Sequence, residues 1–449
     1  YKIDWISMNG KRRLKMKQLT RLFIPICLET LFYMLSGMVD TLMLSAVGDY
    51  AVGAVGTANS YIGIFIIMFS IISSGMVSVM TQNIGAGRPG VAYQARQLGL
   101  LFNAVAGVLM AVFLFSGAGA ILRMVGIADA LYEPALIYLK IVGGGCILNA
   151  VIPIFSSYLR AFGYTKQPLY ATIVGNIANF VMNAVFLFVL HKGVAGVATA
   201  TVISKILNLC IVLYFSHKLI SAKNSTERIA NKTVLGQIVK VGLPSACETA
   251  LYNVAMMLVI RFLNQMDAEG LNVTARSYTA TISNFSYCVG AALAQANAIM
   301  TGWHIGAGEL EECDRGTKRA AFVGVCVAVC METAIVLGSG FIMPLFTDNP
   351  EMTALVRKLL AIDIVLEIGR VTNLVFGQAL KTSGDAVFPA VIAAVFMFVF
   401  AVGGTWLFGI SMGLMAVGAY IGLASDECVR AVGMVWRWKT GKWRTKKLV

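Results

Sequence analysis

Charged residues are scarce in this sequence. Asp, Glu, Lys and Arg make up 13% of its 449 residues, whereas a soluble domain has about 25%, so a soluble globular protein and a disordered chain are both excluded. Only three His are present, and none of the nine Cys forms a Cys-x-x-Cys pair, so no metal site is predicted. Most Cys lie inside apolar runs and are interpreted as buried small hydrophobes. No nucleophile–base pair appears, so we expect no enzyme.

Long apolar runs fill the sequence instead. Hydrophobic residues account for 58% of the chain, and a membrane helix needs about 20 residues. Runs of that length cover 19–47, 51–80, 98–122, 134–158, 168–190, 194–215, 239–263, 271–301, 320–346, 352–380, 387–410 and 412–435. Helix is predicted for each, because lipid offers no water to an open backbone. The expected fold class is an all-α integral membrane protein with twelve transmembrane helices.

Positive charge lies between the runs rather than on one surface. The net charge of +14 is concentrated at both ends and in the connections after every second run. By the positive-inside rule, this pattern predicts a multi-pass protein of the bacterial cytoplasmic (inner) membrane with both termini in the cytoplasm. It argues against nucleic acid as a partner. The partners expected are membrane lipid and a small organic substrate, and we expect a monomer.

The two halves of the sequence repeat one another. Pro-x-x-x-Glu-Thr occurs at 25–30 and again at 244–249, an offset of 219 (244 − 25). Ile-Gly-Ala-Gly at 84–87 recurs at 305–308, and Leu-Arg-x-x-Gly at 159–163 recurs as Leu-Lys-x-x-Gly at 380–384, both at an offset of 221. Three matches at nearly one offset predict two six-helix bundles related by pseudo-two-fold symmetry, with the substrate between them and rocking as the motion.

The repeat also sets the expected organisation of the chain. We predict a basic cytoplasmic N-terminus (1–18), an N-terminal six-helix bundle (19–215), a cytoplasmic linker (216–238), a C-terminal six-helix bundle (239–436) and a basic cytoplasmic tail (437–449).

In this order, the motifs resemble those of the multidrug and toxic compound extrusion (MATE) transporters of the MOP flippase superfamily over nearly the whole chain. The matching residues are Pro25, Asp40, the 82–87 segment, Arg160–Gly163, Asn176, Asn179, Asn183, Gly242–Pro244, Gln295, 305–308 and 380–385. The resemblance implies a secondary active antiporter that exports a drug or metabolite in exchange for H⁺ or Na⁺ by rocker-switch alternating access, with no cofactor beyond that ion. A flippase or exporter of a lipid-linked or amphiphilic anionic substrate on the same fold stays open as the alternative.

Asp40 is the candidate for coupling-ion binding in the first half. Counting along the helices places Asn179, Asn183 and Thr199 at a similar height, so one carboxylate would be surrounded by amide and hydroxyl groups able to hold a proton or Na⁺. The resemblance implies a coupling acid at Asp40. Some relatives pair it with a second acid where this chain has Asn183, and that departure favours a single-acid proton switch.

The second half departs further from the family. Tyr252 and Arg370 stand where relatives with a sodium site there have acids, so that site is not carried over. Glu248 and Arg370 come out at similar depth, and Glu367 lies one turn before Arg370. We expect the three to form a charge cluster that either binds substrate or is purely structural. Asp426, Glu427 and Arg430 in the last run are expected to satisfy one another.

Three further residues are singled out in the first half. Glu29 and Lys205 lie inside apolar runs, where a charge is costly unless paired, so an ion pair between them is predicted, with substrate binding as the other possibility. Pro25 lies near the inner end of the first run, where a kink could act as a hinge.

Overall fold

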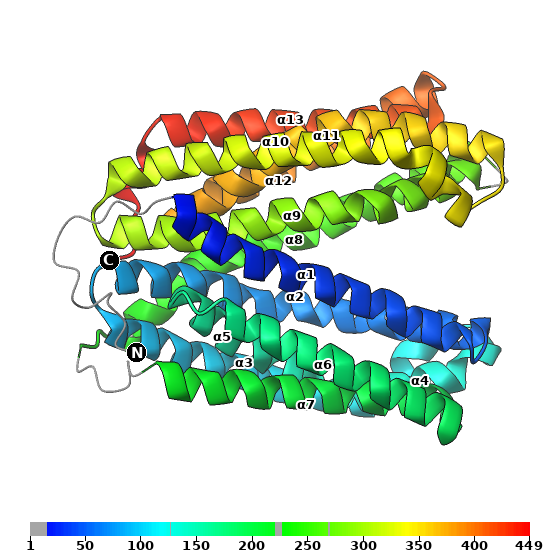
Figure 1. The fold of residues 1–449 in the computed structure, drawn as a ribbon, viewed down its shortest axis with the longest axis horizontal. Helices are drawn as coiled ribbons and strands as arrows, with labels where there is room; N and C mark the ends of the chain where they lie inside the picture. The colour runs from blue at the N-terminus through cyan, green and yellow to red at the C-terminus, as the bar shows by residue number, and fades with distance from the viewer. Residues whose placement is uncertain (1–15, 126, 221–226, 268–269) are drawn as a thin grey trace. The chain divides into compact units, whose positions relative to one another are not determined.

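The computed structural model describes residues 16–125, 127–220, 227–267 and 270–449. The predicted N-terminal segment 1–18 and part of the predicted linker, 221–226, therefore lie mostly outside the described residues. The described residues are almost entirely helical and contain no strand, which confirms the all-α prediction. The chain divides into two compact units (Figure 1), and each is described by itself.

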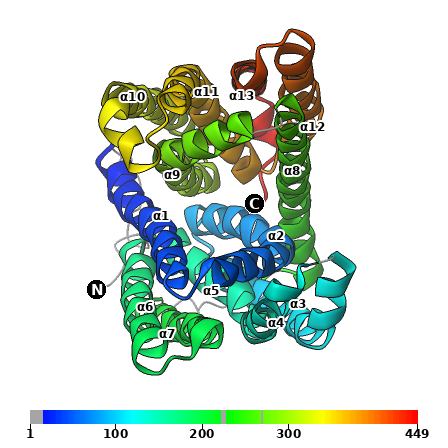
Figure 2. The ribbon, with the colours of Figure 1, turned by 90° about the vertical axis from the view of Figure 1, so that its right-hand side faces the viewer.

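The N-unit comprises Ile24–Ile84 and Arg88–Gly242. It contains most of α1 and the first turns of α8. Its helices are α1 (Met16–Ser45), α2 (Asp49–Gly85), α3 (Pro89–Val125), α4 (Asp129–Gly144), α5 (Cys146–Ala161), α6 (Lys166–Ala184), the π-helical η1 (Val185–Val189) and α7 (Gly193–Leu219). Within it, α6 packs on α7, and α3 packs on α4 and α5, as the end-on view in Figure 2 illustrates.

The C-unit comprises Leu243–Val449 with Gly85–Gly87 and the start of α1. Its helices are α8 (Asn231–Met266), α9 (Leu271–Gly306), α10 (Leu310–Ile342), η3 (Met343–Leu345), α11 (Pro350–Ser383), α12 (Val387–Phe396), η4 (Met397–Val402), η5 (Thr405–Ser411), α13 (Met415–Lys439) and η6 (Lys442–Thr445). The centre of this unit is α11, which packs against α9, α10 and α13.

Three of the predicted spans are bent or pass into π-helix. The fifth passes from α6 into η1. The fourth is the pair α4 and α5, bent by 41° at Gly145. The eleventh passes from α12 into the π-helical segments η4 and η5. Here the chain passes very close to α13: a Cβ on Gly404 would lie 2.9 Å from Gly422 Cα. With each interrupted helix counted as one, the described residues contain a helix at each of the twelve predicted runs.

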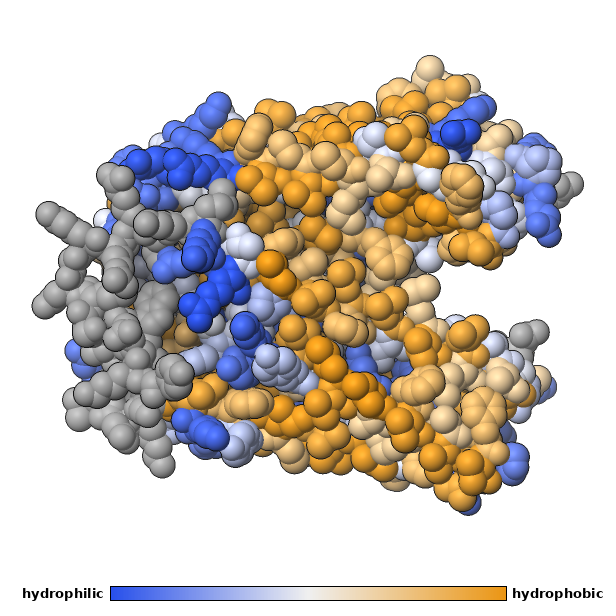
Figure 3. Space-filling view, viewed as in Figure 1, coloured by the Kyte–Doolittle hydropathy of each residue, from blue (hydrophilic) through white to orange (hydrophobic). Residues whose placement is uncertain are grey.

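Apolar side chains cover the outside of the helices. On the face shown in Figure 3 they gather along the middle of the helices, and hydrophilic side chains gather toward the helix ends. Eight described helices are long and apolar enough to cross a membrane, and the bent pair makes a ninth. The remaining long helices, α9, α11 and α13, carry more polar residues and pack on one another. The more polar helices of the C-unit are thus the ones that pack on one another.

The end of the chain folds back onto the C-unit. The buried Trp443 ring stacks on Trp438 with centroids 4.2 Å apart, and Trp438 Nε1 donates to Asp314 Oδ1 at 2.7 Å. Arg437 Nε donates to Asp385 Oδ2 at 2.7 Å, which ties the end of α13 to the turn before α12. The tail is therefore an ordered part of this unit.

Candidate functional site

Asp40 in α1 forms a polar centre in the N-unit with two residues of α6. The Asn183 side chain donates from Nδ2 to Asp40 Oδ1 at 2.8 Å and to Asn179 Oδ1 at 3.2 Å. Both asparagines are buried, and Asp40 is half-buried. The two asparagines are four residues apart and so share one helix face. The structure thus brings together three of the four residues predicted for this site.

Thr199, the fourth residue, makes a different contact. Its hydroxyl donates to the carbonyl of Ala195 in its own helix, at 2.8 Å. Lys205 in α7 and Tyr138 in α4 interact electrostatically with Asp40. The sequence contained a signal for Tyr138, a hydroxyl-bearing side chain inside an apolar run, but the prediction did not use it.

The predicted ion pair between Glu29 and Lys205 is wrong. Glu29 Oε1 pairs with Arg160 Nη2 at the end of α5, at 2.5 Å, and Lys205 Nζ donates to Asn149 Oδ1 at 2.8 Å. Glu29 and Asp40 are eleven residues apart on α1, which separates them by about 16 Å along the axis. Because Lys205 lies near Asp40, it is far along the helix from Glu29.

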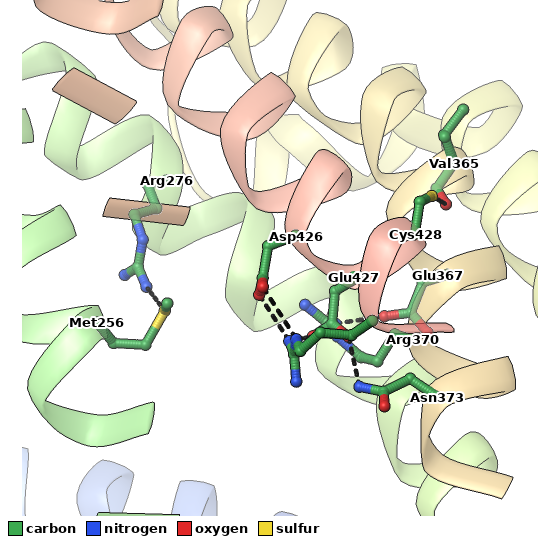
Figure 4. A network of polar contacts seen from close by, with 10 residues as sticks. Met256, Arg276, Val365, Glu367, Arg370, Asn373, Asp426, Glu427 and Cys428 are labelled. Atoms are coloured by element: carbon green, nitrogen blue, oxygen red, sulfur yellow. Dashed lines mark hydrogen bonds and ion pairs between the residues drawn. The ribbon is translucent and has the colours of Figure 1, made fainter. Parts of the chain in front are cut away.

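Arg370 in α11 belongs to an ion-pair network that links α11 to α13 (Figure 4). It pairs with Glu367 of its own helix, and its Nε lies 3.6 Å from Glu427 Oε1 in α13. Glu427 also accepts a hydrogen bond from Asn373 Nδ2 at 3.0 Å. The predicted contact between Glu367 and Arg370 is confirmed, while Asn373 was missed.

Arg430 completes this network. Its Nε and Nη2 donate to the two carboxylate oxygens of Asp426 at 3.0 and 2.7 Å, and Nη2 lies 2.8 Å from Glu427 Oε1. The expectation that these three residues of α13 satisfy one another is confirmed. We call Glu367, Arg370, Asn373, Asp426, Glu427 and Arg430 the α11–α13 network.

The predicted pairing of Glu248 with Arg370 is wrong. Glu248 Oε2 lies 2.8 Å from Lys381 Nζ, near the end of α11. Lys381 occupies the same place in its repeat as Arg160, and Glu248 the same place as Glu29. Each unit therefore carries one equivalent pair between a glutamate one turn after a proline and a basic residue before a Gly turn. The repeated motifs could have predicted both pairs.

Pro25 lies buried within α1, which runs through it as one helix from Met16 to Ser45. Its role as a hinge stays a prediction. Among the described residues, no group of three or more His, Cys, Asp or Glu side chains is arranged to hold a metal ion.

The MatE family model matches residues 25–185 and 244–407. The two matched segments begin 219 residues apart (244 − 25), which is the offset of the internal repeat. This chain belongs to the MATE family. It is therefore a transporter rather than an enzyme, and a multi-pass membrane protein.

Individual relatives agree with this assignment. The MATE chain is 32% identical over 428 residues to the uncharacterized transporter YisQ of Bacillus subtilis, covering 94% of each protein. It is 20% identical to the probable multidrug resistance protein NorM of Thermotoga maritima, covering 96% of this chain and 94% of that protein. A MOP superfamily transporter from Pyrococcus furiosus, 20% identical and with 98% of each chain covered, has the same fold with a TM-score of 0.84.

Proposed function

We propose that this MATE transporter exports a small organic compound in exchange for protons by rocker-switch alternating access, with Asp40 as the proton carrier. The observation that carries the proposal is the pairing of Asp40 with Asn183 at 2.8 Å. An amide donates to a carboxylate and is itself uncharged, so Asp40 is the only acid in this contact. A single acid suits a proton, whereas Na⁺ prefers several oxygen ligands. No cofactor is required beyond the coupling ion.

The driving force is sufficient for such an exchange. One charge moving through 100 mV supplies about 2.3 kcal/mol, and about 1.4 kcal/mol corresponds to a tenfold gradient. One proton per cycle therefore supports a substrate gradient of roughly fifty-fold. We place the protein in the bacterial inner membrane with both termini in the cytoplasm, on the distribution of Lys and Arg between the spans.

The test is ethidium efflux from a pump-deficient bacterial host, comparing the wild type with Asp40→Asn at matched membrane expression. Glu133→Gln, an exposed acid of α4 in the same unit, is the matched control. We expect Asp40→Asn to abolish efflux and Glu133→Gln to retain it. In vesicles, an imposed proton gradient should drive transport without Na⁺; transport that requires a Na⁺ gradient would contradict proton coupling.

An exporter or flippase of an amphiphilic anion is the second candidate. Arg370 keeps 20% of its side chain exposed despite its ion pairs, and its guanidinium lies 5.8 Å from the Tyr287 ring centroid. The Pyrococcus furiosus relative carries the description "reverse polarity of binding pocket suggests different function". Wild-type protein that binds anionic amphiphiles but not ethidium, with anion binding weakened in Arg370→Lys, would favour this candidate. Lysine keeps the charge but loses the bidentate geometry of arginine.

A further inference from the structure

Two carboxyl groups in the C-unit have no part in the α11–α13 network. Glu332 lies in the middle of α10, and Asp363 lies in α11, two turns before Arg370. The exposed fraction is 0% for Glu332 and 3% for Asp363. The two carboxyl groups interact electrostatically with each other. They therefore form an acidic pair enclosed between helices rather than facing lipid.

Buried hydroxyl groups from a third helix face this pair. Ser286 of α9 interacts with Glu332, and Ser283, one turn earlier, interacts with Asp363. Both serines are more than nine-tenths buried. Neither hydroxyl reaches a well-aligned hydrogen bond, and the same holds for both oxygens of Glu332 and for Asp363 Oδ2. Five polar atoms thus converge with hydrogen-bonding capacity unused, which is costly in a protein interior.

The pair lacks an ion-pair partner in the part of the chain that the structure describes. Among the ion pairs of the described residues, none includes Glu332 or Asp363. Arg370 interacts with both at longer range, but its ion-pair partners are Glu367 and Glu427. An unpaired carboxylate inside a membrane protein is strongly disfavoured, so some other species must balance this charge.

The acidic pair and the α11–α13 network together also carry more acids than cations. It contains five carboxyl groups, Glu332, Asp363, Glu367, Asp426 and Glu427, against two guanidinium groups, Arg370 and Arg430. The other polar groups of the region are the Asn373 amide, which donates to Glu427, and hydroxyls, including that of Tyr420 in α13, which interacts with Asp363. Arg276 of α9 interacts with Tyr420 and forms no ion pair with the acids among the described contacts. The acids remain in excess.

We propose that Glu332 and Asp363 form a proton-binding site inside the C-unit, distinct from the Asp40 site of the N-unit. A proton on either carboxyl removes its charge and supplies the O–H donor that the unpaired oxygens lack. The Ser283 and Ser286 hydroxyls can then accept or donate within the same group. A proton fits better than a metal ion, because no group of three or more His, Cys, Asp or Glu side chains among the described residues is arranged to hold a metal.

The position of the site links it to the α11–α13 network. Glu367 interacts electrostatically with Glu332 and Asp363, and it is also the ion-pair partner of Arg370. Loss of a proton from the pair would add negative charge beside Glu367 and strengthen the field on Arg370. Protonation of the pair is thereby coupled to the charge balance around Arg370.

The test is infrared spectroscopy of the full-length protein in lipid nanodiscs, in H₂O and in D₂O. The readout is the carbonyl stretch of protonated carboxyl groups, which shifts on deuteration. At neutral pH we expect the wild type to show such bands, Glu332→Gln or Asp363→Asn to lose one of them, and Glu309→Gln, an acid before α10 whose side chain is 40% exposed, to leave them unchanged. Asp40→Asn should leave the Glu332 and Asp363 bands in place.

Each outcome decides the proposal. If neither variant changes the protonated-carboxyl bands from acid to neutral pH, both groups are ionised and the proposal is overturned. If Na⁺ removes the bands while choline does not, the site binds a metal cation in place of the proton, and the proton assignment is overturned. Should a variant misfold, ¹³C-carboxyl labelling of glutamate or of aspartate in the wild type assigns the bands. The spectra require no transport, so failure of the proposed export would leave this result intact.

Discussion

The two units derive from one repeat but use charge differently. Both retain a pair between a helix glutamate and a basic residue, Glu29 with Arg160 and Glu248 with Lys381. Beyond that pair, the N-unit surrounds Asp40 with amides, whereas the C-unit joins α11 to α13 through five charged side chains and one amide. Among the described contacts Asp40 forms no ion pair, although Lys205 interacts with it electrostatically, so its charge can change without breaking an ion pair. A closed network resists such a change, so we assign switching to the first arrangement and rigidity to the second.

The largest effect should come from removing a cation from the α11–α13 network. Arg430→Met would leave Asp426 and Glu427 without their closest cation. Removing one member of a buried ion-pair network costs about 3–5 kcal/mol, so we expect a large drop in thermal stability, measured by size-exclusion chromatography after heating. Arg430→Lys should lose less. The matched N-unit change, Lys205→Met, removes a contact to the neutral Asn149 and should cost clearly less than Arg430→Met. Equal losses would contradict the comparison.

The second prediction tests whether the α11–α13 network depends on the close approach of these two helices. A Cβ on Gly369 would lie 2.7 Å from Cys428 N, a backbone atom that cannot move aside. Overpacking of this kind costs about 1–3 kcal/mol, so Gly369→Ala should be destabilising. Gly377→Ala in the same helix is the control, because its Cβ would meet only Asn373 Oδ1 at 3.9 Å. It should be neutral or stabilising by up to about 1 kcal/mol. Similar losses in both variants would mean that helix spacing is not the cause.

The third prediction concerns what the units share. Double-mutant cycles with Glu29→Gln and Arg160→Met, and with Glu248→Gln and Lys381→Met, measure the coupling free energy of the two equivalent pairs. Their side chains are exposed to a similar extent, 12% and 17% for the first pair and 21% and 12% for the second. We therefore expect similar coupling, within the range of about 0.5–3 kcal/mol found for residues in contact. Coupling confined to one unit would show that the repeat does not preserve this contact energetically.

The sequence predicted the height of each charged or polar side chain along its helix better than it predicted which residue that side chain contacts. Helix rise per residue places Asp40 near Asn183 and Arg370 near Glu367, and both contacts are present. The same counting failed for Glu248 with Arg370, because Glu248 pairs with Lys381 instead. The height of a residue does not specify the face of the helix on which its side chain lies. That face decides which neighbouring helix the side chain contacts.

Part of the information needed to predict the contact partners was present in the internal repeat. Two motifs at one offset, each with a charged residue, indicate that those residues keep the same neighbours in both halves, as the Glu29–Arg160 and Glu248–Lys381 pairs do. The bend at Gly145 and the π-helical segments before α13 had no such signal. Beside the π-helical segments, small residues pack closely between helices, such as Gly404 against Gly422, and that contact depends on tertiary structure.

The smallest effect tests whether burial, rather than charge alone, separates strong pairs from weak ones. Arg315 Nη2 pairs with Glu312 Oε1 at 2.8 Å on α10, a distance like that between Arg430 and Glu427, but the side chains are 55% and 27% exposed. Exposed pairs contribute about 0–1 kcal/mol because water screens them. Arg315→Gln should therefore shift thermal stability little, and added salt should shrink that shift further, while the loss in Arg430→Met should depend weakly on salt. If the two variants lost the same stability and responded alike to salt, water would screen the α11–α13 network as it screens the surface, and its assigned rigidity would have no physical basis.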